Sequence, residues 1–162
     1  MDKKKPYCCI KHLKTLHPLK NLLLGGRSKG VVLLEGGVVK KTYDKKSRSQ
    51  ISRFEKEVAV LKRLQGCEYI PKLYKIDPKN KIIWLEYVGK NVTLTEDMKS
   101  TVNKALKFIG EKYQVYRVKN GKAKYSYKDL FPANICVNNE GKVYLIDFGS
   151  NLWQIGTNKS FF

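Results

Sequence analysis

The segment from Tyr125 to Gly149 constrains this chain more than any other part of its sequence. Ile135–Val137 has the composition of a short strand, and Lys142–Ile146 has that of a second one. The residues between them, Asn138–Gly141, are all typical of turns except for one glutamate. We therefore predict a β-hairpin here, which returns the end of its second strand beside the start of its first.

Three polar residues flank this predicted hairpin at fixed spacings. Asn134 lies five positions after Asp129 and immediately precedes the first strand, and Asp147 immediately follows the second. We expect Asn134 and Asp147 to lie close together at the open end of the hairpin, with Asp129 one short loop away. Two carboxylates and an amide supply hard oxygen ligands, which suit Mg²⁺ and leave room for phosphate oxygens.

These residues resemble the protein kinase superfamily, whose catalytic loop has the pattern D-x-x-x-x-N and whose metal-binding motif is D-F-G. Asp129 and Asn134 match the first pattern, and Asp147-Phe148-Gly149 match the second. The resemblance implies that ATP and Mg²⁺ are used. It also implies that Asp129 accepts the proton of a substrate hydroxyl, and that Asn134 and Asp147 bind the metal. The alternative is an ordinary hairpin with solvated polar residues at its ends.

The amino-terminal half contains further features that are similar to kinase motifs. A predicted strand, glycine-rich turn and strand over Leu22–Val32 resemble the loop that covers the nucleotide phosphates. Arg27 replaces one glycine of that pattern, and a guanidinium there is suited to phosphate. Without the motifs that follow, the same residues are equally typical of a plain hairpin turn. The residues that the resemblance assigns to nucleotide binding in this loop are Gly25, Gly26, Arg27, Gly30 and Val32.

The next hairpin ends in the strand Val38–Tyr43, which is similar to the kinase strand that carries the phosphate-binding lysine. Lys40 aligns best with that lysine, and Lys41 points to the opposite face because side chains alternate along a strand. One of the two is expected in the cleft and the other in solvent. Our assignment is Lys40, as the residue that holds the α- and β-phosphates.

A helix is predicted over Ser47–Leu64, because apolar residues recur at spacings of three and four. Glu57 lies closer to the apolar stripe than Glu55 and is therefore expected to flank the core. The family resemblance implies that Glu57 orients the strand lysine. The simpler alternative is a surface glutamate, since charged helix positions are usually solvated.

A third hairpin is predicted over residues 71–87, and it leads into a segment similar to the kinase hinge. The resemblance implies that Glu86 and Val88 bind adenine and that Leu85 lies at the back of its pocket. A second helix is predicted to begin after Thr95, which is a good cap. Val115–Lys124 contains Asn-Gly and predicts a further hairpin, which we interpret as a local addition to the kinase pattern.

Lysine and arginine outnumber acidic residues strongly, and the formal net charge is +19. This charge favours anionic partners such as nucleic acid, an acidic protein, a membrane surface or nucleotide phosphates. The four cysteines form no Cys-x-x-Cys pair, which argues against a zinc site and favours a reducing compartment. The chain also lacks a long apolar run and a signal peptide. We therefore expect no membrane span and a cytoplasmic location (the host cytoplasm for a viral chain), with the nucleus as the alternative.

Together these features predict an α+β fold of the protein kinase-like type. The expected arrangement is a five-stranded antiparallel amino-terminal lobe with one helix, followed by a strongly reduced helical carboxy-terminal lobe. The predicted division is a basic tail over residues 1–20, the first lobe over 21–88 and the second over 89–162. The small size, the Val-Val-Lys-Lys strand and the Leu-Ile-Asp-Phe-Gly ending resemble compact atypical kinases of the RIO and Bud32 type.

The predicted function is ATP- and Mg²⁺-dependent phosphoryl transfer to a hydroxyl, in the manner of a minimal protein Ser/Thr kinase. The main alternative is a pseudokinase or kinase mimic that binds nucleotide and regulates a partner protein. Small-molecule kinases and nucleic-acid-binding modules are further alternatives. Expected partners are ATP and a protein substrate or regulator, with self-association or an RNA-linked assembly as extensions. We expect apolar residues near the end of the chain to lie on an exposed surface that a second copy or another protein covers, namely Trp153, Phe161 and Phe162.

Overall fold

The computed structural model of the chain describes residues 22–23 and 31–156. Within these residues, the first part of the chain forms one antiparallel sheet with the strand order β1-β2-β3-β5-β4. Its strands are β1 (Leu22–Leu23), β2 (Val31–Glu35), β3 (Val38–Thr42), β4 (Leu73–Asp77) and β5 (Ile82–Glu86). The predicted hairpins β2–β3 and β4–β5 are confirmed by their pairing.

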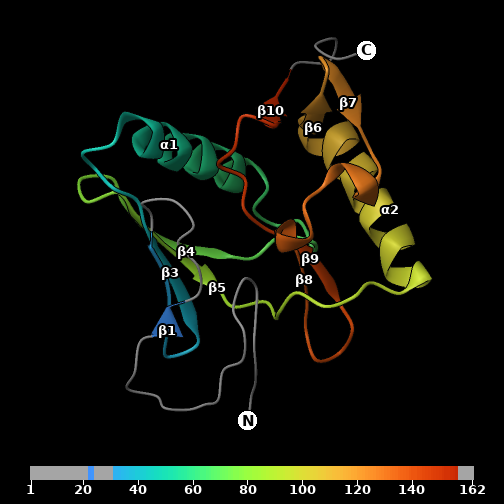
Figure 1. The fold of residues 1–162 in the computed structure, drawn as a ribbon, viewed down its shortest axis with the longest axis horizontal. Helices are drawn as coiled ribbons and strands as arrows, with labels where there is room; N and C mark the ends of the chain where they lie inside the picture. Colours follow the sequence, from blue (N-terminus) through green and yellow to red (C-terminus); the bar gives the residue numbers. More distant parts are fainter. Residues whose placement is uncertain (1–21, 24–30, 157–162) are drawn as a thin grey trace.

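Helix α1 (Arg48–Arg63) lies beside this sheet, as Figure 1 shows. Ser47 caps it by accepting a hydrogen bond from the backbone N–H of Gln50. The buried side chains of α1 include Phe54, Val60 and Leu61, which belong to the apolar stripe of the helix or border it. The predicted helix is therefore confirmed, and its bounds differ from the prediction by one residue at each end.

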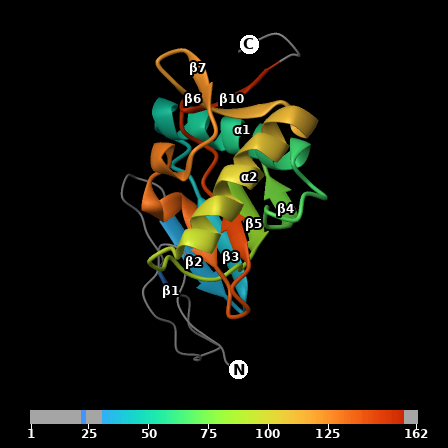
Figure 2. The same ribbon diagram turned by 90° about the vertical axis from the view of Figure 1, so that its right-hand side faces the viewer.

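Helix α2 (Glu96–Tyr113) begins after Thr95, whose side chain accepts a hydrogen bond from the N–H of Met98. The buried face of α2 includes Val102 and Ile109. Figure 2 shows α2 in front, with β6, β7 and β10 at the top of the view and β1, β2 and β3 toward the bottom.

The remaining strands belong to two small sheets. The first has the order β10-β6-β7 and the second pairs β8 with β9. Their bounds are β6 (Val115–Lys119), β7 (Lys122–Lys124), β8 (Ile135–Val137), β9 (Val143–Leu145) and β10 (Trp153–Ile155). Both predicted hairpins are confirmed. The interpretation of β6–β7 as a local addition was incomplete, because β6 also pairs with β10, which follows the Asp-Phe-Gly segment.

The connection from β5 to α2 crosses the β8–β9 hairpin at one close backbone contact. Lys90 forms an isolated bridge with Val137. Gly89 precedes it with a φ angle of +113°, and a Cβ atom at Gly89 would lie 2.2 Å from the carbonyl oxygen of Val137. Only glycine fits this backbone approach without displacing the hairpin.

One hydrophobic core extends through both parts of the molecule and includes the residues after the Asp-Phe-Gly segment. Trp153 is fully buried in it, so our expectation that Trp153 is exposed was wrong. Its ring packs on Phe148 with a centroid distance of 4.7 Å, which the sequence did not reveal because the two residues belong to different predicted segments. Phe161 and Phe162 lie outside the described residues.

The mixed α/β architecture with antiparallel sheets is consistent with the kinase-like fold that we expected. Neither of the two helices in the described part of the chain is long and apolar enough to cross a membrane.

Candidate nucleotide and phosphotransfer site

The lysine that reaches the predicted catalytic residues is Lys41. Its Nζ atom lies 2.6 Å from Oε1 of Glu57 and 2.9 Å from Oδ1 of Asp147. Lys40 instead lies over the ring of Trp84, with 5.9 Å between Nζ and the ring centroid. The assignment of Lys40 as the partner of Glu57 was therefore wrong. The physical reason is strand alternation, which sends adjacent side chains of β3 to opposite faces of the sheet.

The two carboxylates determine the protonation of Lys41. Burial alone would lower the pKa of this ammonium group, but the negative charges of Asp147 and Glu57 outweigh it. The pKa of Lys41 is consequently well above its usual value. Lys41 therefore remains a cation throughout the neutral range.

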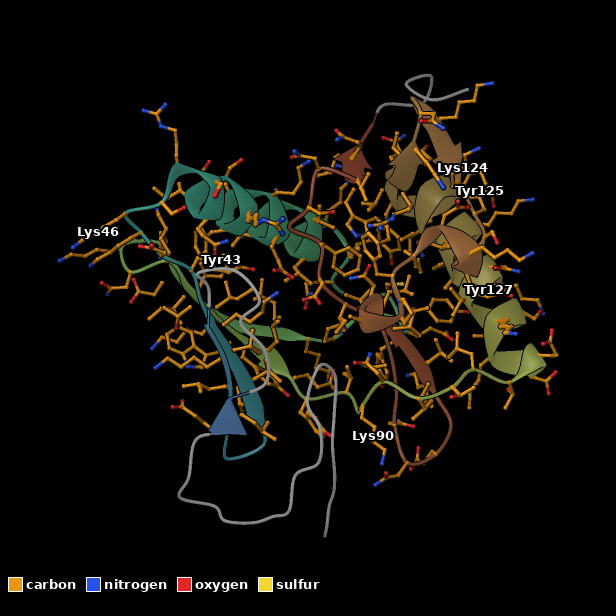
Figure 3. The ribbon with its side chains drawn as sticks, viewed as in Figure 1. Tyr43, Lys46, Lys90, Lys124, Tyr125 and Tyr127 are labelled. Carbon is orange, nitrogen blue, oxygen red and sulfur yellow. The ribbon has the colours of Figure 1, made fainter. Side chains whose placement is uncertain are left out.

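Glu57 is 1% exposed, as its place beside the apolar stripe predicted, whereas Glu55 is exposed. Besides the contact with Lys41, it accepts hydrogen bonds from the hydroxyl of Tyr43 and from the backbone N–H of Phe148, the latter at 3.2 Å. Figure 3 shows Tyr43 between β3 and α1. Burial, followed by the charge of Glu57, raises the pKa of Tyr43 well above its usual value, so its hydroxyl stays a donor.

Asp147 follows β9 and has a φ angle of +65°. This left-handed conformation is uncommon for a residue other than glycine, and aspartate tolerates it better than most. The conformation is associated with functional positions when the surrounding structure holds it. The two residues that follow are closely packed. Phe148 is fully buried, and a Cβ atom at Gly149 would lie 2.9 Å from the carbonyl oxygen of Arg53. Figure 1 shows this segment passing between α1 and α2.

Asn134 lies where the hairpin predicted it, opposite the end of β9. Its backbone carbonyl oxygen accepts a hydrogen bond of 2.9 Å from the backbone N–H of Ile146, the residue before Asp147. The side-chain Oδ1 atom of Asn134 is buried and has no hydrogen-bond partner among the described residues. Burying a hydrogen-bond acceptor without a donor costs free energy, and an oxygen in this situation is suited to binding a cation.

This donor set fits Mg²⁺. Asn134 and Asp147 would supply two hard oxygen ligands. A site made of three or more His, Cys, Asp or Glu side chains is not found among the described residues. Mg²⁺ is commonly held by only one or two protein carboxylates together with substrate phosphates.

Asp129 lies at the end of the 3₁₀ turn η1 (Tyr127–Asp129), which Ser126 caps. The side chain of Asp129 is 18% exposed. Its backbone carbonyl accepts a hydrogen bond of 3.0 Å from Nε of Arg117, and its carboxylate lies 4.0 Å from Nζ of Lys119. Both basic residues come from β6, so the β6–β7 hairpin belongs to the surroundings of this aspartate.

A pocket lies against the predicted hinge. The residues that line it come from the hinge and from the β8–β9 hairpin, and they are Glu86, Tyr87, Val88, Gly89, Lys90, Val137, Asn138, Asn139 and Tyr144. The predicted adenine-binding residues Glu86 and Val88 are thus brought together, although the pocket does not extend to Lys41 or Asp147. Val32 is half-buried against the core, and the other predicted loop residues lie outside the described part, namely Gly25, Gly26, Arg27 and Gly30.

Sequence reasoning missed Tyr43, Arg117 and Lys119. A signal for the first was present, because Val39 and Tyr43 are both large and apolar and share a strand face with Lys41. That alternation favours Lys41 over Lys40 for the buried face. The contacts of Arg117 and Lys119 join residues ten or more positions apart across a loop, and no local pattern predicts them.

A strand lysine that bridges a helix glutamate and the aspartate of an Asp-Phe-Gly segment defines a protein kinase-like site. The comparisons with known proteins agree with this class. A family model described as RIO domain matches residues 36–155, and the chain therefore belongs to the RIO domain family, an atypical protein kinase family. The predicted resemblance is confirmed.

The chain is also similar to a curated protein of Encephalitozoon cuniculi (strain GB-M1) named as a probable cAMP-dependent protein kinase catalytic subunit. The two are 31% identical over 107 residues, which cover 63% of this chain and 33% of that relative. The match therefore spans about a third of the length of this relative.

Proposed function

We propose that this protein is an ATP- and Mg²⁺-dependent protein kinase that transfers the γ-phosphoryl group to a serine or threonine hydroxyl. The observation that carries the proposal is the position of Lys41, bonded to both Glu57 and Asp147. A lysine so placed remains positively charged and is suited to nucleotide phosphates. We assign the amino-terminal lobe to residues 21–88 and the carboxy-terminal lobe to residues 89–162.

In the proposed reaction, the substrate hydroxyl oxygen forms a bond to the γ-phosphorus of ATP. The bond between that phosphorus and the β–γ bridging oxygen breaks, and its electron pair leaves with ADP. Asp129 accepts the hydroxyl proton. Lys41 holds the α- and β-phosphates, and Glu57 orients Lys41. Catalysis of this kind depends mainly on positioning and charge neutralisation.

Asn134 and Asp147 would hold Mg²⁺, which neutralises phosphate charge when bound. The proposal is supported by the unpartnered buried oxygen of Asn134 and by the left-handed backbone of Asp147. The hinge residues Glu86 and Val88 are proposed to bind adenine, and the loop over residues 25–30 is proposed to cover the phosphates.

The test is transfer of labelled γ-phosphate from ATP with Mg²⁺ to the protein itself and to a generic basic substrate. The wild type is compared with Lys41→Met and Asp129→Asn, and Lys40→Met serves as the matched control. Label that is incorporated by the wild type and Lys40→Met, and lost in the other two, supports the proposal. Phosphoamino-acid analysis of the product then checks the specificity for serine and threonine.

Nucleotide binding measured by thermal shift separates the remaining outcomes. Binding without transfer would contradict the kinase proposal and favour a nucleotide-binding kinase mimic. Failure to bind any nucleotide would contradict the site as a whole.

A further inference from the structure

Strand β6 brings two basic side chains to the loop that carries Asp129. Arg117 and Lys119 are two positions apart and therefore point to the same face of the strand. Nε of Arg117 donates to the backbone carbonyl of Asp129 at 3.0 Å, and Nζ of Lys119 lies 4.0 Å from its carboxylate. One strand thus contacts both the backbone and the reactive side chain of the proposed base.

The position of β6 relative to Asp129 is fixed by burial. Arg117 is 3% exposed, and its guanidinium lies 5.5 Å from the ring centroid of Phe131 and 5.3 Å from that of Trp153. Burial lowers the pKa of Arg117 and the charge of Asp129 opposes that shift, so the group remains a cation at neutral pH. Pairing of β6 with β10 holds the strand from its other side. Lys119 is therefore presented beside Asp129 by a rigid element.

Lys119 itself is 61% exposed. An ion pair at this distance with one partner largely in solvent contributes little to folding, because water and salt screen it. A structural role therefore gives a weak account of Lys119. A cation beside the base has a clear chemical use, since the transferring phosphoryl group must lie next to the hydroxyl that Asp129 deprotonates.

We propose that Lys119 is a further catalytic residue, whose ammonium group binds the oxygens of the γ-phosphoryl group during transfer. This inference rests on the proposed function and extends it by a group outside the Asp129–Gly149 motifs. Lys119 adds positive charge where negative charge is shared between the attacking and leaving oxygens, and a cation so placed stabilises the transition state more than the bound substrate.

Lys122 provides a matched control. It lies directly opposite Lys119 in the β6–β7 pair, is exposed and carries the same charge. The ion pair with Asp129 is made by Lys119. Replacing either residue by methionine changes the net charge equally and leaves the hairpin turn untouched.

The experiment compares wild type, Lys119→Met and Lys122→Met by two readouts. The first is kcat for phosphate transfer. The second is the affinity for MgADP with and without aluminium fluoride, which occupies the position of the transferring phosphoryl group. We expect Lys119→Met to lower kcat about 10–100-fold and to weaken the fluoride complex by a similar factor, somewhat less than the loss of a fully enclosed donor. Affinity for MgADP alone and the thermal midpoint should stay unchanged, and Lys122→Met should resemble wild type throughout.

Two results would overturn the inference: an unchanged fluoride complex in Lys119→Met, or an equal loss in Lys119→Met and Lys122→Met, which would assign the effect to net charge. A wild type that binds the fluoride complex but transfers no phosphate would refute the proposed function alone, and the binding comparison would still decide the role of Lys119. A wild type that binds no nucleotide would refute both.

Discussion

The two halves of the candidate site are held in different ways. Around Lys41, charged side chains contact one another directly, and Glu57 at their centre is 1% exposed. Around Asp129, the carboxylate is partly exposed, and the loop is fixed through its backbone by Arg117. The first half should therefore contribute to both folding and catalysis, whereas the second should contribute to catalysis with little effect on folding.

The difference follows from desolvation. A buried carboxylate such as Glu57 is stable only while its partners remain, because an uncompensated charge in the interior is costly. A partly exposed carboxylate such as Asp129 keeps access to water, so its replacement leaves little strain behind. Stability and activity measured together on the same variants test this distinction.

The largest loss of stability is expected for Lys41→Met, which removes the cation shared by Glu57 and Asp147. We expect the free energy of unfolding to fall by about 3 kcal/mol, at the low end for a broken buried pair because Tyr43 and Phe148 still donate to Glu57. Transfer activity should fall by at least about 100-fold. Urea unfolding and the kinase assay on the same protein samples measure both.

Lys40→Met is the matched control for this variant, since it removes an adjacent lysine of β3. Its contact over Trp84 is a cation–π interaction between two half-buried side chains, so a loss of about 1 kcal/mol is expected. Equal effects of the two substitutions on stability would contradict the assignment of Lys41 to the buried face.

Asp129→Asn should lower activity strongly and leave the stability of the fold nearly unchanged. Loss of the proposed base is expected to lower kcat by about 100- to 10,000-fold. The free energy of unfolding should change by less than about 1 kcal/mol, because the 4.0 Å contact with the exposed Lys119 contributes little and the backbone contact with Arg117 remains. A large loss of stability, measured by urea unfolding, would show that the two halves of the site are not distinct.

The same contrast explains what the sequence could predict. Asn134 and Asp147 were placed together because a hairpin fixes its own ends, and Glu57 was placed near the core because helical periodicity fixes its face. The choice between Lys40 and Lys41 depends on which face of β3 meets α1, and the motif alignment outweighed the alternation that favours Lys41. The contacts of Arg117 depend on the pairing of β6 with β10, which is a long-range event with no local signal.

Tyr43→Phe should destabilise the fold less than Lys41→Met does. It removes one of three donors to Glu57 while keeping the ring. A hydrogen bond to a charged acceptor contributes about 1.5–3 kcal/mol, so the free energy of unfolding should fall within that range. Tyr74→Phe, on the exposed part of β4, is the control and should leave stability unchanged. If Tyr43→Phe unfolds at the same urea concentration as wild type, the hydroxyl of Tyr43 does not support Glu57.

The last effect on stability should appear only at alkaline pH and be absent at neutral pH. The pKa of Lys41 is raised in the folded protein, so the stability that Lys41 contributes is fully present below its unfolded pKa of about 10.4 and is lost as pH rises toward the folded value. The raised pKa of Tyr43 acts in the same direction from about pH 10. Each group should lower the free energy of unfolding by up to about 1.4 kcal/mol per pH unit in that window. Urea unfolding from pH 8 to 11 should therefore show the difference between wild type and Lys41→Met narrowing above pH 10, with a shallower slope in Tyr43→Phe than in wild type. Parallel pH curves for the three proteins would mean that neither group is held in the buried charged set, and the contrast between the two halves of the site would then fail.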